Sequence, residues 1–172
     1  MQGIHILARD SLFLDSPKSV PYTPGVTQVR FRELSSSIVS YAAQLVYTGK
    51  TADSYRLLSA ADRLFRSFSD PGSEEPAPLA DELATAACFL EVLRILTSLE
   101  IELVVDLDEE ARSALFVGCG SLVDAVDRVV AAHDSAADPI RIVLIEDGDR
   151  RGRGLVLVAG ENRLPIPAGA DR

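Results

Sequence analysis

The stretch FRELSSSIVSYAAQLVYTGKTADSYRLLSAADRLFRSF, residues 31–68, decides how the rest of the chain is interpreted. Apolar residues recur at spacings of three and four on both sides of Gly49-Lys50, which predicts two amphipathic helices. Glycine favours the left-handed conformation that ends a helix, and Thr51 is a suitable N-cap for the next one. The stretch therefore predicts an antiparallel helical hairpin over residues 26–69.

A single hairpin of this size is expected to leave a broad apolar stripe exposed, and a second hairpin is the usual cover for such a stripe. The sequence thus predicts a homodimer in which two hairpins form a four-helix bundle. The residues expected at the dimer interface are Phe31, Leu34, Ile38, Tyr41, Leu45, Leu58, Ala61, Phe65 and Phe68.

Outward from the hairpin, the pattern predicts an α+β chain. Residues 1–25 read as an irregular N-terminal arm, and residues 70–78, acidic and rich in proline, read as a linker between two domains. Periodicity after the linker predicts a helix over 78–99 that is buried on two sides, a strand over 101–107, a helix from Asp108 to about Ala132, and strands over 140–145 and 155–158. Residues 161–172 are expected to be a flexible tail.

Composition narrows the classes of function. The formal net charge of −9 disfavours a nucleic-acid partner, because acidic surfaces repel phosphate backbones. No apolar run approaches the ~18 residues of a membrane span, and no signal peptide is evident. Cys88 and Cys119 lie far apart in apolar runs, so buried thiols, no metal site and a cytoplasmic location are expected.

The order of these elements resembles the transmitter core of bacterial sensor histidine kinases, in particular the autolysin-regulating type. Phe89-Leu90-Glu91-Val92-Leu93-Arg94 stands where that family has a phrase of the type Tyr-Leu-Glu-Ile-x-Arg, and IELVVDLDEEA (101–111) resembles the first strand of its GHKL ATPase domain. The Gly49-Lys50 turn is also similar to that of the sporulation phosphotransferase B family. The resemblance implies a truncated histidine-kinase ATPase-like α/β sandwich over residues 79–160.

The same resemblance implies a site that lacks the phospho-acceptor histidine and the ATP-binding residues of the family. Glu33 occupies the position expected for the phospho-acceptor histidine, which leaves His133 and His5 as the alternative acceptors. Leu122-Val123-Asp124-Ala125 stands where the family has Leu-Val-Glu-Asn, so Ala125 replaces the magnesium ligand. After Val158 the chain has Ala159-Gly160-Glu161-Asn162, without the adenine-binding aspartate followed by glycine that the family has there. A degenerate nucleotide site at Asp124, Ala125 and Gly160, with no cofactor, is therefore the expectation.

These expectations favour a non-catalytic signalling adaptor, a pseudokinase that binds a response-regulator receiver domain or a kinase. An ATP-independent histidine phosphotransferase is one alternative, although the first helix has no histidine. An anti-sigma-like or other protein-binding regulator is a second alternative. A dimeric structural domain with a small-molecule pocket is a third.

Overall fold

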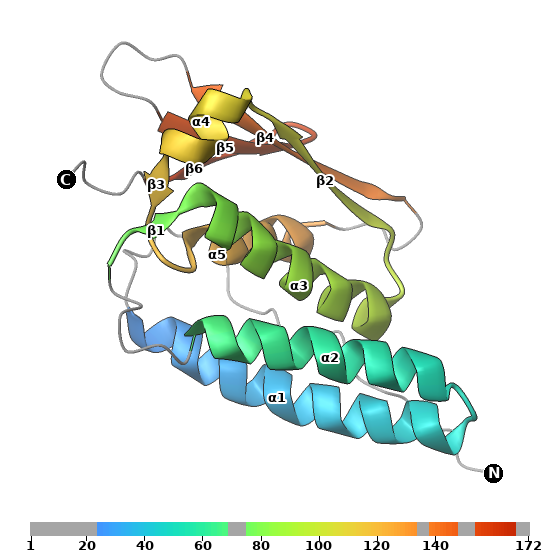
Figure 1. Ribbon diagram of the computed structural model, residues 1–172. Helices are drawn as coiled ribbons and strands as arrows, with labels where there is room; N and C mark the ends of the chain where they lie inside the picture. Colours follow the sequence, from blue (N-terminus) through green and yellow to red (C-terminus); the bar gives the residue numbers. More distant parts are fainter. Residues whose placement is uncertain (1–23, 69–74, 134–137, 148–153, 168–172) are drawn as a thin grey trace.

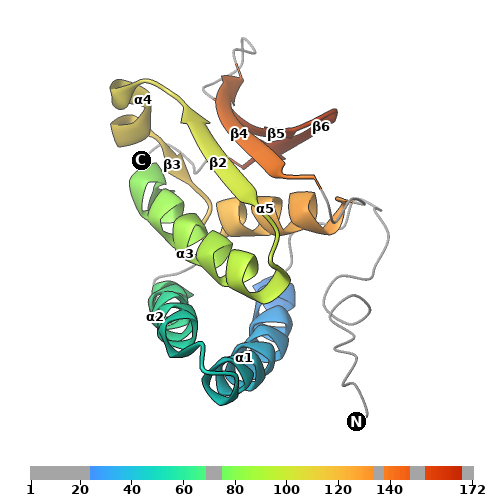
Figure 2. The same ribbon diagram turned by 90° about the vertical axis from the view of Figure 1, so that its right-hand side faces the viewer.

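The computed structural model describes residues 24–68, 75–133, 138–147 and 154–167. The described elements form a mixed α+β arrangement in three layers (Figures 1 and 2). A helical hairpin forms the first layer, two further helices lie in the middle, and a four-stranded sheet lies on the other side. The hairpin therefore packs against helices and is separated from the sheet by the middle layer.

The hairpin consists of α1 (Pro24–Tyr47) and α2 (Thr51–Phe68). Gly49 has a φ of +79°, and the Lys50 N–H donates to the Leu45 carbonyl at 2.8 Å, as in a glycine-terminated helix. Farther along, the buried Ser54 hydroxyl donates to the Ala42 carbonyl at 3.1 Å and joins the two helices. The predicted hairpin and its left-handed glycine cap are confirmed.

After the hairpin, strands and helices alternate as far as α5, and three consecutive strands follow. These elements are β1 (Ala77–Pro78), α3 (Leu79–Thr97), β2 (Ile101–Asp106), α4 (Glu109–Ala114), β3 (Phe116–Val117), α5 (Ser121–Ala131), β4 (Ile140–Asp147), β5 (Gly154–Ala159) and β6 (Asn162–Ile166). The main sheet has the order β2-β4-β5-β6, with β2 parallel to β4 and the other neighbours antiparallel. A separate pair, β1 and β3, is antiparallel.

Three boundaries differ from the sequence-based prediction. The single helix predicted from Asp108 to about Ala132 is two helices, because α4 ends at Ala114 and β3 follows. Part of the predicted tail forms β6, joined to β5 by a turn in which Gly160 has a φ of +58°. The end of the predicted linker forms β1, while residues 69–74 lie outside the described part.

The hydrophobic core is continuous across the predicted domain boundary. Leu57 and Leu64 of α2 belong to the same cluster of buried side chains as Leu90 of α3 and Leu144 of β4. Helix α3 contacts both α2 and α5, which confirms that it is buried on two sides. The linker predicted two separate cores, but the hairpin and the α/β segment share one core.

Candidate functional site

Most of the apolar stripe predicted for the dimer interface is buried inside a single chain. Leu34, Ile38, Leu45 and Ala61 are each less than a tenth exposed. Tyr41, Phe65 and Phe68 are partly buried and pack against the same core. The expectation that a single chain leaves this stripe exposed to solvent is wrong for these residues. They are covered by α3 and by the other helix of the same hairpin.

Three other residues named in the sequence-based predictions for the hairpin are not part of this buried stripe. Leu58 is 46% exposed and is the one predicted interface residue with a largely free side chain among those described. Glu33 lies exposed on α1. Phe31 also belongs to α1, but its side chain lies outside the described part.

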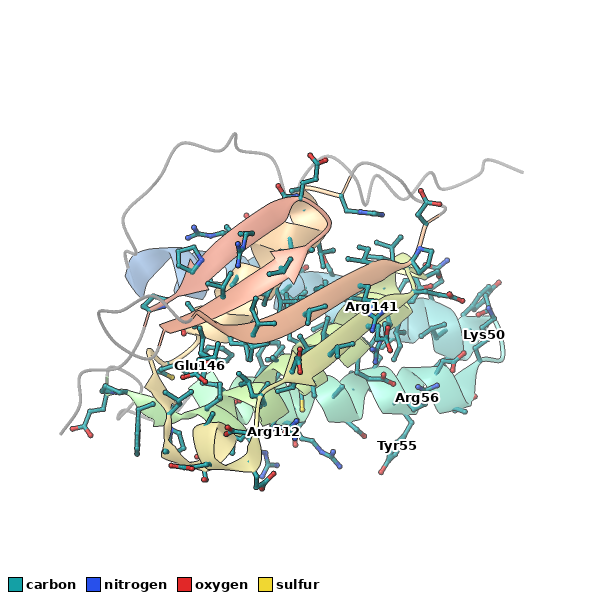
Figure 3. The ribbon with its side chains drawn as sticks, turned by 90° about the horizontal axis from the view of Figure 1, so that it is seen from above. Lys50, Tyr55, Arg56, Arg112, Arg141 and Glu146 are labelled. Carbon is teal, nitrogen blue, oxygen red and sulfur yellow. The ribbon has the colours of Figure 1, made fainter. Side chains whose placement is uncertain are left out.

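The outward surface of the hairpin carries most of the exposed large apolar side chains of the described residues. Six such side chains are more than 40% exposed, and five of them lie in α1 and α2. They are Val39 at 65%, Val46 at 54%, Tyr47 at 92%, Tyr55 at 75% and Leu58 at 46%, while the sixth is Phe116 in β3. Figure 3 shows Tyr55 projecting from α2 away from the rest of the molecule. We call these five residues the hairpin surface.

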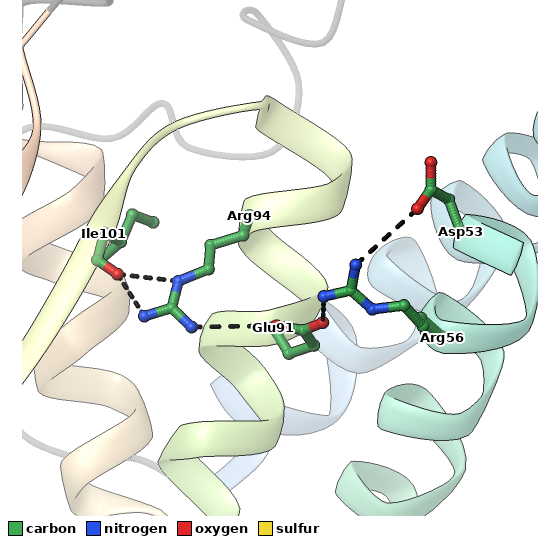
Figure 4. A network of polar contacts seen from close by, with 5 residues as sticks. All are labelled: Asp53, Arg56, Glu91, Arg94 and Ile101. Atoms are coloured by element: carbon green, nitrogen blue, oxygen red, sulfur yellow. Dashed lines mark hydrogen bonds and ion pairs between the residues drawn. The ribbon is translucent and has the colours of Figure 1, made fainter. Parts of the chain in front are cut away.

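A polar network fastens the hairpin to α3 beside this surface (Figure 4). Arg56 of α2 forms an ion pair with Glu91 of α3 and a longer one with Asp53. Glu91 also lies 3.8 Å from Arg94, whose guanidinium donates to the Ile101 carbonyl at the start of β2. The network links α2, α3 and the start of β2 by polar contacts that are partly exposed to solvent.

A groove of about 920 Å³ runs between α2 and α3. Its lining includes the short side chains of Ala60, Ala84 and Ala87. Cys88 also lines the groove, but none of the lining residues is a histidine that could activate its thiol as a nucleophile. The groove is therefore a surface feature with charged borders and has no paired catalytic groups among its lining residues.

The residues of the predicted nucleotide site lie on α5 and on the β5–β6 turn. Asp124 forms a 2.7 Å ion pair with Arg128, one turn along α5. Ala125 is 6% exposed, and a buried methyl group offers no ligand for a metal ion. Gly160 lies in a tight turn with no atom within 4 Å of the position of a Cβ. The described residues contain no group of three or more metal-ligating side chains.

The N-terminus of α5 is occupied by a side chain of the chain itself. Glu82 of α3 is 3% exposed, and its Oε1 accepts a 2.9 Å hydrogen bond from the Gly120 amide. Gly120, the N-cap of α5, has no side chain that could accept from the amides of the first turn, and the Glu82 carboxyl group from α3 lies there instead, close to the Leu122 amide. A helix N-terminus often binds phosphate, but here an anion would meet a carboxyl group.

Burial raises the pKa of Glu82, because desolvation disfavours the charged form. The nearby amides of Gly120 and Leu122 and the Cys119 thiol favour the ionised form and offset part of this effect, whereas Asp81 adds to it. Oε2 of Glu82 and the Ser121 hydroxyl have no hydrogen-bond partner among the described residues. The role of Glu82 could not be predicted, since nothing in the sequence shows that α3 reaches the start of α5.

Gly120 connects this N-terminus to the end of the hairpin. Its φ is +74°, and a Cβ at this position would lie 2.9 Å from Cε1 of Phe68, the last residue of α2. The close approach requires a residue without a side chain. The ends of α2, α3 and α5 therefore meet at Phe68, Glu82 and Gly120.

Of the two histidines predicted as alternative phospho-acceptors, the structure describes His133. His133 follows α5, is half-buried, and has its Nε2 3.3 Å from the Asp138 carbonyl oxygen. His5 lies outside the described residues. None of the helices in the described segments is both long enough and apolar enough to cross a lipid bilayer. In comparisons with known proteins, the chain matches no protein-family model and no curated protein sequence.

Proposed function

We propose that this chain is a non-catalytic signalling adaptor that binds a partner protein through the hairpin surface. The observation that carries the proposal is the concentration of five of the six exposed large apolar side chains on α1 and α2. Exposed apolar patches on otherwise well-packed chains mark protein-binding sites more often than isolated apolar residues do. The partner class, a response-regulator receiver domain or a kinase, follows from the resemblance to the histidine-kinase core.

The positions at which kinase chemistry is expected support an adaptor over an enzyme. Glu33 stands at the acceptor position, and a carboxylate does not form the phosphoimidazole that relays phosphate. The Ala125 side chain has no oxygen that could bind a magnesium ion, and Asp124 is engaged with Arg128. In this proposal the kinase-like order of elements serves to hold the hairpin in place for docking.

The hairpin surface is suited to this role because some of its residues share a face of their helix. Val39 and Val46 are seven residues apart, which places them on the same face of α1. Leu58 is the exposed neighbour of the fully buried Leu57, so it contributes to the surface without contributing to the core. Binding energy at such surfaces is concentrated in a few apolar and aromatic anchors.

The proposal is tested by titration calorimetry against purified receiver domains and kinases encoded beside the gene for this chain. We expect Val46→Asp and Leu58→Asp each to weaken binding by about tenfold or more, since a buried charge at an interface is costly. Phe116→Asp is the matched control, because Phe116 is equally exposed but lies on β3, and its affinity should stay within about twofold of the wild type. Failure of every receiver domain and kinase to bind would count against the adaptor function.

A labelling experiment separates the adaptor from a phosphotransferase. Incubation with a phosphorylated receiver domain should leave no acid-labile phosphate on the chain. If label appears and is lost in His133→Ala, the ATP-independent phosphotransferase replaces the adaptor.

A further inference from the structure

The face of the main sheet that points away from the helices carries a continuous apolar strip. Val104, Val143 and Val158 lie side by side across β2, β4 and β5, and Ile145 and Val156 form a second row beside them. Four of these side chains are half-buried, and Val156 is buried. Figure 3 looks onto this face, which we call the outer sheet face.

These residues lie on the face of the sheet that points away from the core. Ile142, Leu144 and Leu157 are completely buried and belong to the core cluster beneath the sheet. Their immediate neighbours point to the other side, because successive side chains alternate across a strand. Helices α3 and α5 and the hairpin all lie on the core side in Figures 1 and 2. No described helix packs on the outer sheet face.

The two edges of the sheet are protected against the addition of another strand. Along β2, Arg94 donates to the Ile101 carbonyl, and Arg112 donates to the Val105 and Leu107 carbonyls at 3.1 Å. Along β6, Pro165 lacks the amide that an incoming strand would pair with. A partner of this sheet therefore meets the half-buried side chains of the face, and not the edges.

Charges border the outer sheet face in a polarised way. Glu102 and Asp106 flank Val104 on β2, and Glu102 forms a 3.6 Å ion pair with Arg141 of β4. At the opposite border, Arg163 of β6 pairs in register with Val158. On this face, β2 thus carries two carboxylates, one of them paired with Arg141, and β6 carries the Arg163 guanidinium.

We propose that a second copy of this chain packs on the outer sheet face, so that two sheets form a symmetric sandwich. A twofold axis parallel to the strands and between β4 and β5 brings the β2 side of one copy against the β6 side of the other. Arg163 of each copy then lies opposite Val104 of the other, between Glu102 and Asp106. The apolar rows meet at the centre, as in packed sheets about 10 Å apart. This dimer does not depend on the proposed adaptor function.

The mass of the chain in solution tests this interface. Sedimentation equilibrium of the full chain should give twice the monomer mass of 18.5 kDa. Val143→Asp should yield monomers, because it places a charge at the centre of the apolar strip. Arg163→Glu should weaken the dimer by about tenfold or more, and adding Asp106→Arg to it should restore most of the lost affinity, because the charges are then exchanged. Leu58→Asp, on the hairpin surface, should leave the dimer intact.

Circular dichroism checks that each variant is folded. If Val143→Asp does not fold, the exposed Arg163→Glu variant still tests the interface. A wild-type chain that stays monomeric at all concentrations overturns the proposal, including the case in which its own N-terminal segment covers the face. A dimer that Leu58→Asp dissociates and Arg163→Glu does not also overturns it, since the hairpins would then form the interface.

Discussion

Helices α2 and α5 are both amphipathic, but the structure uses their apolar residues differently. In α5, eight of the eleven residues are buried, and the helix lies within the core on most of its circumference. In α2, five of the eighteen residues are buried, and exposed apolar residues stand directly beside them. An amphipathic pattern therefore shows which residues avoid water, but it does not distinguish a core helix from one that keeps a side for a partner.

The largest effect expected from this comparison is the difference between two adjacent leucines of α2. Leu57 is fully buried, so Leu57→Ala should reduce the free energy of unfolding by about 2–5 kcal/mol through lost contacts and the cavity left behind. Leu58→Ala should cost less than about 1 kcal/mol, because this side chain is 46% exposed. Urea unfolding of both variants measures the difference. Equal losses would mean that the hairpin surface is part of the fold and not free for a partner.

The next effect concerns the contact between α5 and the end of the hairpin. Gly120→Ala should cost about 1–3 kcal/mol, because the left-handed backbone and the nearby Phe68 ring both oppose a Cβ. Gly160→Ala is the control: it has a similar φ but open space around it, so only the backbone strain of about 1 kcal/mol applies. In a Phe68→Leu background the cost of Gly120→Ala should fall. An unchanged cost would show that the ring does not press on this glycine.

A smaller effect depends on pH and on the capping carboxyl group of α5. Because burial raises the pKa of Glu82 in the folded chain, its contribution to stability is present at pH values below the unfolded pKa and is lost as pH rises through the folded pKa. Glu82→Gln remains neutral, so its free energy of unfolding should improve relative to the wild type between about pH 4 and pH 7. Glu100→Gln, at an exposed position, controls for the loss of one negative charge. A constant difference across this pH range would contradict the pKa shift.

The smallest effect is expected from the ion pair that fastens α2 to α3. The Arg56 side chain is 60% exposed and that of Glu91 is 28% exposed, so solvent screens their attraction. A double-mutant cycle with Arg56→Ala and Glu91→Ala should give a coupling energy of about 0.2–1 kcal/mol. A coupling of several kcal/mol would assign the attachment of the hairpin to this network and not to Leu57 and Leu64.

The long elements could be predicted from the sequence because each has its own periodicity. The helix predicted from Val26 begins at Pro24, and the strand predicted at Ile101 begins at that residue. The two-residue strands β1 and β3 were missed, since two residues hold no pattern. Strand β6 was missed because Arg163 and Pro165 interrupt its apolar residues, and its pairing with β5 is what makes it a strand.

The candidate sites were predictable only where they depend on residue identity. That Ala125 has no metal-binding side chain can be read from a single position, while the degenerate nucleotide site itself stays a prediction. The element that covers the apolar stripe of the hairpin could not be predicted in this way, because it is α3, which lies beyond the predicted linker. The contact between Glu82 and Gly120 spans 38 positions, and no local signal indicates it. In each of these misses the deciding contact joins segments that are distant in sequence.

The parallel pairing of β2 with β4 has a consequence for the order of folding. The hairpin closes through a short turn, whereas β2 and β4 meet only after the whole segment 107–139 has been placed beside them. Contacts between distant segments form slowly, because the loop must lose its freedom before the pairing repays it. Refolding should therefore show helical signal early and sheet closure as the rate-limiting step. On the ribosome, a nascent chain that has not yet extended to Ile140 keeps the sheet-facing side of α3 open to chaperones.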